Sequence, residues 1–220
     1  MMTRFLALAA LALASVSACA QVGVEPYQAG THYFPIEPAQ PTATGDKVEV
    51  VEVFSYACIH CAHFEPQVKA WKAKMPANVE FSYLPAIFNP SWEVFARAYY
   101  AAEVLGIAEK AHQDLFDGIH VRRDVRNLDD IAKIYAKHGK TEQQFVDATK
   151  SFGVEMKINR AKQMVPRYQV DGTPTLVVNG KYRVTGGSAG GADKVFDVVN
   201  FLIAKETSAK KVAAAAAATP

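Results

Sequence analysis

Cysteine is scarce in this chain: only three occur among its 220 residues. Cys19 lies close to the N-terminus, whereas Cys58 and Cys61 are separated only by Ile59 and His60. Three thiols are too few for a framework of structural disulfides or for a zinc site with four cysteine ligands. The cysteine chemistry of the chain is therefore expected to centre on one close pair.

Charge of one sign and long apolar runs are scarce as well. The chain has 24 Lys and Arg against 22 Asp and Glu, a formal net charge of +2, and no long block of one sign. The composition therefore indicates no nucleic-acid partner. The apolar stretch 5–14 is shorter than the roughly 20 residues needed to cross a bilayer. With 50% hydrophobic residues, the chain can build one ordinary domain or one domain carrying a large insertion.

Residues 1–20 have the pattern of an export signal. Arg4 supplies a positive start, the apolar stretch follows, and residues 18–20 form a small-residue cleavage pattern. Residues 16–19 also resemble a bacterial lipobox, in which Cys19 is the lipidated residue. Both interpretations place the mature protein outside the cytoplasm. It would be either free in the periplasm or anchored by a lipid on Cys19 to a membrane, on the side that faces the periplasm.

After the signal, the first part of the domain is predicted over residues 21–88. An irregular arm contains one short strand candidate, and a nearly continuous β-branched and aromatic run follows, as expected of a strand buried on both faces. A helix and a second strand complete a β-α-β unit. These segments are the arm at 21–46 with its strand candidate at 31–36, the buried strand at 48–56, the helix at 58–75 and the second strand at 79–85.

Residues 89–165 lack strand signals and show apolar residues at helical spacing instead. Asn127 with Asp130, and Thr141 with Gln144, have the spacing of helix N-terminal caps. A segment of this length is too long for a loop. It is therefore predicted to be a helical subdomain inserted into the β-α scaffold.

The scaffold resumes over residues 166–205. Pro174 opens a β-branched run, Asn179 and Gly180 predict a hairpin turn into a strand at 181–185, and a glycine-rich loop precedes a closing helix at 192–204. The alanine-rich residues 206–220 have no apolar stripe, and we expect them to be disordered.

Cys58 stands where the buried strand passes into the helix. The first turn of a helix has unpaired N–H groups and a partial positive charge, which favour a thiolate over a thiol. Cys61 lies one turn further along and can form a small disulfide ring with Cys58. The pair is therefore predicted to be redox-active.

The chain resembles the DsbA-type periplasmic thiol:disulfide oxidoreductases of the thioredoxin superfamily over about residues 30–205. The resemblance rests on the order of the elements and on three stretches, which are 51–65 (VEVFSYACIHCAHFE), 172–175 (GTPT) and 178–182 (VNGKY). It implies an α/β thioredoxin fold with an inserted all-helical subdomain. It also implies a monomeric enzyme that donates its Cys58–Cys61 disulfide to reduced or unfolded exported proteins, needs no other cofactor, and is reoxidised by a DsbB-type membrane quinone oxidoreductase.

Several further site residues follow from these motifs. Burial is expected to raise the pKa of Glu52, and the resemblance suggests that this acid relays the proton of Cys61. The lysine that pairs with the acid in the family has no counterpart within 79–85. His60 is expected to stabilise the Cys58 thiolate. The resemblance also implies a cis Thr173–Pro174 bond that faces Cys58, with Thr173 pairing with an extended substrate; Ile59 and His63 are further substrate-binding candidates.

Three alternatives remain at this point. Ile59 replaces the proline often found in DsbA motifs, and Thr173 is shared with isomerase-type relatives, so a reductase or isomerase is the nearest one. His60 and His63 beside the two cysteines suggest a metal-binding protein. Apolar residues at the start of the insertion, Phe88 and Trp92, suggest a non-catalytic chaperone. The isolated histidines of the helical region, His112, His120 and His138, are expected to be solvated.

Overall fold

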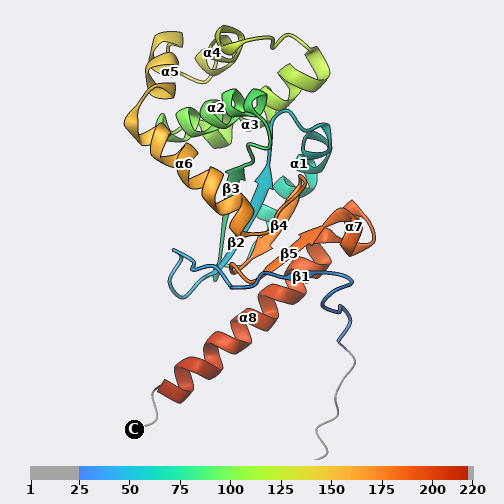
Figure 1. The fold of residues 1–220 in the computed structure, drawn as a ribbon. Helices are drawn as coiled ribbons and strands as arrows, with labels where there is room; N and C mark the ends of the chain where they lie inside the picture. Colours follow the sequence, from blue (N-terminus) through green and yellow to red (C-terminus); the bar gives the residue numbers. More distant parts are fainter. Residues whose placement is uncertain (1–24, 218–220) are drawn as a thin grey trace, which may run out of the picture.

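The computed structural model describes residues 25–217, so the predicted signal 1–20 and Cys19 lie outside the described residues. A mixed sheet of five strands, in the order β1-β5-β4-β2-β3, forms the centre of the fold (Figure 1). Its interior strand β2 is parallel to β3 and antiparallel to β4. The strands are β1 (Phe34–Pro35), β2 (Val48–Phe54), β3 (Val79–Pro85), β4 (Thr175–Val178) and β5 (Tyr182–Thr185).

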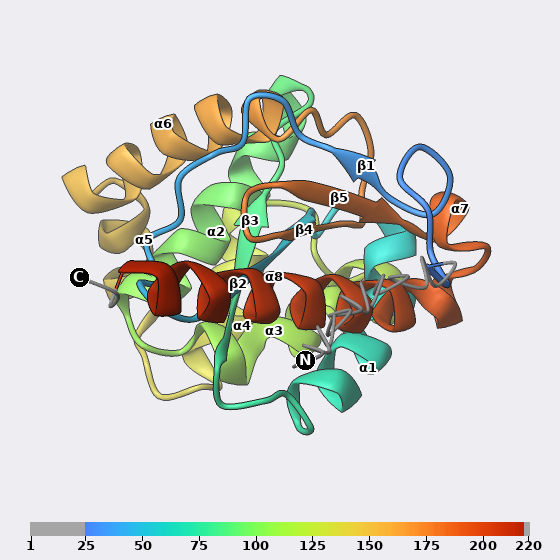
Figure 2. The same cartoon turned by 90° about the horizontal axis from the view of Figure 1, so that it is seen from below.

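Helices cover both faces of this sheet. Helix α8 lies across one face (Figure 2), and its core side chains pack with those of α1 and of alternate residues of β2. The five helices of the insertion, α2 to α6, lie together at the end of the molecule away from the C-terminal part of α8 (Figure 1). The helices are α1 (Ile59–Lys72), α2 (Glu93–Val104), α3 (Ala108–Asp117), α4 (Leu128–Ala136), α5 (Glu142–Thr149), α6 (Phe152–Arg167), α7 (Gly186–Ala189) and α8 (Val195–Ala217).

Strand β2 is the element that positions the site. Val48 and Val50 face the core shared with α1 and α8, while Val51 and Val53 face the core shared with the insertion. Burial on both faces explains why its sequence is nearly continuously apolar. The chain turns into α1 just after the end of β2. The first turn of α1 therefore lies beyond the carboxyl end of this strand, next to the insertion.

The predicted thioredoxin fold with a helical insertion is confirmed. The caps at Asn127 and Thr141 are present, and each side chain accepts a backbone N–H three residues on. Three local expectations need correction. The strand expected at 31–36 shrinks to β1, the helix expected at 58–75 is the shorter α1, and the glycine-rich loop contains α7.

The expectation of disorder after residue 205 is wrong for residues 206–217, which continue α8. Alanine favours the helix, and polar contacts replace the missing apolar stripe. The Glu206 carboxylate is buried and accepts from Asn179 Nδ2 at 2.6 Å and from Lys181 Nζ at 2.7 Å. Lys210 Nζ donates to the carbonyl of Lys47 at 2.6 Å. These contacts attach the helix to the hairpin and to the segment before β2.

Among residues 25–217, the structure has no helix that combines the length and apolar character required to traverse a bilayer.

Candidate active site

Cys58 is the N-terminal cap of α1. Its backbone is extended, with φ −91° and ψ 112°, and its N–H donates to the Ser55 carbonyl at 3.0 Å. The backbone N–H of Cys61 donates to Cys58 Sγ at 3.4 Å. Both cysteines are free thiols in this structure. The sulfur of Cys58 therefore takes the place that a serine or aspartate oxygen takes in an ordinary helix cap.

The two thiols have opposite acidities. The Cys61 side chain, with smaller contributions from Thr173 and the backbone of α1, stabilises the thiolate and lowers the pKa of Cys58 to about 5, although burial opposes the shift. Burial raises the pKa of Cys61, and its hydrogen bond to Cys58 raises it further. Cys61 is only 1% exposed, against 9% for Cys58. At neutral pH the reduced pair is therefore a Cys58 thiolate beside a Cys61 thiol.

The Thr173–Pro174 peptide bond is cis, as the sequence resemblance implies. In its thiol form Cys58 Sγ donates to the Thr173 carbonyl at 3.4 Å. The loop is held just beyond the proline, where the Thr175 hydroxyl donates to the Gly172 carbonyl at 2.8 Å. The structure thus brings together two motifs that lie 115 residues apart.

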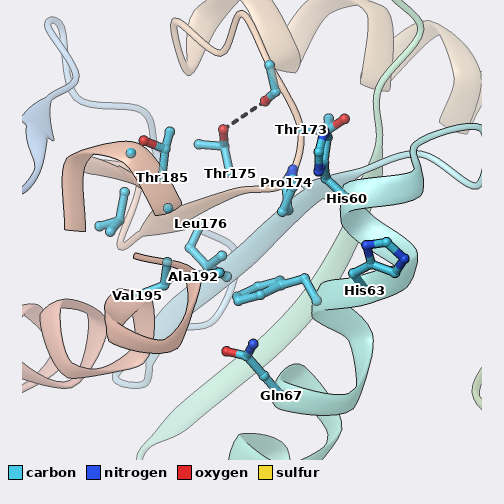
Figure 3. Close-up of a pocket in the computed structure, with 15 residues that line it drawn as sticks. His60, His63, Gln67, Thr173, Pro174, Thr175, Leu176, Thr185, Ala192 and Val195 are labelled. Atoms are coloured by element: carbon cyan, nitrogen blue, oxygen red, sulfur yellow. Dashed lines mark hydrogen bonds between the residues drawn. The ribbon is translucent and has the colours of Figure 1, made fainter. Parts of the chain in front are cut away.

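An apolar groove of about 460 Å³ opens beside this pair (Figure 3). Its walls are α1, the loop that carries Pro174, the strands β4 and β5, α7 and the start of α8. His60 and His63 are exposed on the α1 side of the groove, with His60 next to Thr173 and Pro174 and His63 further along the helix (Figure 3). Ile59 is 40% exposed and lies outside the lining.

Glu52 lies in the interior of the sheet and is 1% exposed. Burial raises its pKa, the negative charge of Glu65 adds to this shift, and Lys72 opposes it. The Lys72 ammonium lies 2.8 Å from both carboxylate oxygens of Glu109, so much of its charge is already compensated. No side chain in the described residues hydrogen-bonds Glu52 Oε2. The raised pKa expected from the sequence is thus found, and the cation that opposes it, Lys72, is on α1 rather than on β3.

The expectation that the three isolated histidines are solvated is wrong. His112 is 3% exposed, and its Nδ1 lies 2.8 Å from the Tyr56 hydroxyl. His120 Nε2 donates to the Tyr56 carbonyl at 2.7 Å, and His138 Nε2 lies 3.1 Å from Asp114 Oδ2. His112 is placed between Ala111 and Leu115 on the buried face of α3. Helical periodicity could have identified it as a core residue.

Because His120 holds the carbonyl of the residue two positions before Cys58, its loss should loosen the active-site turn. We expect His120→Ala to lower the free energy of unfolding by about 1–3 kcal/mol, since a partly buried carbonyl loses its donor. Urea denaturation of the reduced protein measures this change. His138→Ala is the matched control for loss of a partly exposed histidine contact, and equal losses in both variants would contradict a special role for His120.

Among residues 25–217, no group of three or more histidine, cysteine and acidic side chains has an arrangement that could hold a metal ion.

Comparisons with known proteins agree with this geometry. Residues 49–202 match the family described as DSBA-like thioredoxin domain. The chain is 36% identical to the thiol:disulfide interchange protein DsbA of Pseudomonas syringae pv. tomato over 206 residues, which is 93% of this chain and 96% of the relative. It is 38% identical to the protein of the same name from Azotobacter vinelandii over 184 residues, which is 82% and 85% of the two chains.

Solved structures give the same result. The crystal structure of Pseudomonas aeruginosa DsbA superposes with a TM-score of 0.79 at 36% identity, covering 84% of this chain and 97% of the other. The oxidoreductase DsbA from Xylella fastidiosa gives a TM-score of 0.79 at 35% identity, covering 84% and 100%. The predicted family, fold and enzyme class are therefore confirmed: the chain belongs to the DsbA-like thioredoxin family and is a thiol:disulfide oxidoreductase.

Proposed function

We propose that Cys58 and Cys61 form the disulfide that this enzyme donates to reduced exported proteins. The observation that carries the proposal is the low pKa of Cys58, about 5, beside the buried Cys61 thiol. A stabilised thiolate favours the reduced form of the pair, and an enzyme whose reduced form is favoured is a strong oxidant of other dithiols. Donation is therefore favoured over reduction or isomerisation.

The transfer takes two steps. A substrate thiolate attacks Cys58 Sγ, the bond between Cys58 and Cys61 breaks, and Cys61 leaves with the electron pair. A second substrate thiolate then attacks the substrate sulfur of the mixed disulfide and releases Cys58 as a thiolate. The substrate loses two electrons and the enzyme gains them. Because the Cys61 sulfur is buried, it must take up a proton on leaving, and Glu52 is the proton donor that we assign to this step.

The groove beside Pro174 is the proposed substrate site. Thr173 offers its backbone to an extended chain as to an added strand. His60 and His63 face this chain from α1, and His60 also offers an N–H donor to the Cys58 thiolate. The exposed Ile59 extends the apolar contact next to Cys58. The apolar lining fits the side chains of proteins that have not yet folded.

The cellular setting is part of the proposal. The export pattern of residues 1–20 and the family membership support a periplasmic enzyme that acts as a monomer. A DsbB-type membrane quinone oxidoreductase is the proposed acceptor of its electrons. Cys19 lies outside the described residues, and no lipid anchor is proposed.

The equilibrium of the reduced and oxidised protein in a series of glutathione buffers tests the direction of transfer. The protein used is residues 21–220, so that Cys58 and Cys61 are its only cysteines. We expect the potential of the pair to lie well above that of glutathione, because the Cys58 thiolate is stabilised. A potential below that of glutathione would contradict disulfide donation and would make the chain a reductase.

A further inference from the structure

A buried polar cluster lies behind the active site. His112 of α3 stands between two partners, with Nδ1 2.8 Å from the Tyr56 hydroxyl and Nε2 3.3 Å from Glu65 Oε2. The Tyr83 hydroxyl donates to Glu65, 3.1 Å from each carboxylate oxygen. His112 is 3% and Glu65 6% exposed. The established disulfide exchange uses none of these side chains directly.

The buried carboxylate of Glu65 needs partners that compensate its negative charge. A buried charge is costly unless it is paired or hydrogen-bonded. Glu65 has two partners of this kind, the Tyr83 hydroxyl and the imidazole of His112. The contact at 3.3 Å is an ion-pair distance without good alignment of the N–H, and aromatic rings surround the imidazole. These rings belong to Phe54, Tyr56, Tyr83, Tyr99 and Phe116.

The cluster is connected to Glu52 through the sheet. Glu52 of β2 and Tyr83 of β3 are direct partners in the parallel register, and Tyr83 contacts Glu65. Glu65 and Glu52 are close enough to repel each other. The carboxylate of Glu65 therefore makes it harder for Glu52 to lose its proton.

We propose that His112 is a positioning residue for disulfide exchange: it compensates the buried carboxylate of Glu65, whose charge keeps the proton on Glu52 until Cys61 needs it. This inference deepens the proposed donor function and rests on it. When the bond between Cys58 and Cys61 breaks, the Glu52 carboxylic acid gives its proton to Cys61 Sγ and becomes a carboxylate. Glu52 is then protonated again from solvent.

Other titratable groups face this cluster from every neighbouring element. Those whose charge acts on Glu52 are the thiols of Cys58 and Cys61 and the compensated ammonium of Lys72, all on or before α1. Phenol groups and one carboxylate face the cluster from the other elements. They are Tyr56 after β2, Tyr83 on β3, Tyr99 on α2, Glu109 on α3 and Tyr135 on α4. Glu65 is the only carboxylate among the described residues that both contacts His112 and repels Glu52.

The test uses His112→Phe, which keeps a ring in the aromatic surround, and Glu65→Gln, which removes the charge. The first readout is the titration of the Glu52 side-chain carboxyl in the oxidised protein, followed by carbon-13 NMR. We expect its midpoint to move to lower pH by about one unit in both variants, because the repulsion is lost. In His112→Phe the buried charge of Glu65 loses the partner that compensates it, so we expect the same direction of change as in Glu65→Gln.

The second readout is the rate at which a reduced dithiol peptide is oxidised, measured against pH. The part of the profile in which the rate falls with rising pH reports loss of the Glu52 proton. We expect this fall to occur at lower pH in both variants. His138→Phe is the matched control, since His138 contacts Asp114 away from the site, and it should leave both readouts unchanged.

An unmoved Glu52 midpoint in either folded variant overturns the proposal, and Glu65→Gln decides the charge coupling to Glu52 if His112→Phe does not fold. A rate that falls by the same factor at every pH, with the midpoint unmoved, also overturns it, because it marks a purely structural role. A wild-type protein that fails to oxidise the peptide contradicts the donor function instead. The NMR midpoint still tests the charge coupling in that case.

Discussion

Replacing Cys58 with serine should abolish dithiol oxidation, whereas replacing Cys61 with serine should leave a reactive thiol that stops at a mixed disulfide. Neither variant can form the internal disulfide, so neither can accept two electrons from a substrate dithiol. In Cys61→Ser the helix N-terminus, the backbone N–H of residue 61 and Thr173 remain to stabilise the Cys58 thiolate. Peptide oxidation measures the loss, and mass spectrometry after incubation with oxidised glutathione detects the mixed disulfide.

Alkylation of the reduced wild type supplies the control. With a pKa of about 5, Cys58 is almost entirely thiolate at pH 7, and its thiolate fraction is roughly 100-fold above that of a cysteine with the ordinary pKa of 9.0. Cys61 is buried and stays protonated. Iodoacetamide at pH 7 should therefore label Cys58 first and leave Cys61 nearly unlabelled. Equal labelling of the two thiols, or peptide oxidation by Cys58→Ser, would contradict these roles.

The cysteine pair that we propose to be catalytic could be predicted from the sequence because its signals are local. A buried strand, a turn and a helix N-terminus follow one another within residues 48–61, and each has its own pattern of residues. The same holds for Thr173 and Pro174, which directly precede β4. Local pattern alone does not place this loop against Cys58, and the fold supplied that distance.

The missed features depend on contacts between distant segments. Helical periodicity could place His112 on the buried face of α3, but its contacts with Glu65 and Tyr56 exist only because α3 packs behind α1, and nothing near His112 in the sequence shows them. Glu206 likewise extends α8 by meeting Asn179 and Lys181 of a hairpin formed earlier in the chain. The face by which a helix packs can be recognised from the spacing of its apolar residues alone. A contact made by a single buried polar residue can be recognised only when its partner is known.

The stability of the reduced protein should rise with pH between about 5 and 9 because of Cys58. Its pKa is about 5 in the folded chain against an ordinary value of 9.0. A depressed pKa stabilises the folded state fully above the unfolded value, and this stabilisation is lost as the pH falls toward the folded value. The contribution is roughly 3 kcal/mol at pH 7 and changes by about 1.4 kcal/mol per pH unit. Cys61 adds nothing below about pH 8, since it is a thiol in both states there, and as the pH approaches its ordinary value of 9.0 its raised folded pKa begins to lower the stability.

Urea denaturation of reduced wild type and of Cys58→Ser at several pH values isolates this contribution, because other titrating groups are common to both. The difference in unfolding free energy should grow from pH 5 to pH 9 and vanish below pH 5. The redox potential gives an independent check. Between pH 5 and 9 reduction takes up two electrons and one proton, so the potential should fall by about 30 mV per pH unit, and by about 59 mV per unit below pH 5 where a second proton is taken up. A slope of about 59 mV per unit at pH 7 would show that Cys58 is protonated in the reduced enzyme, and the argument for a strong disulfide donor would fail with it.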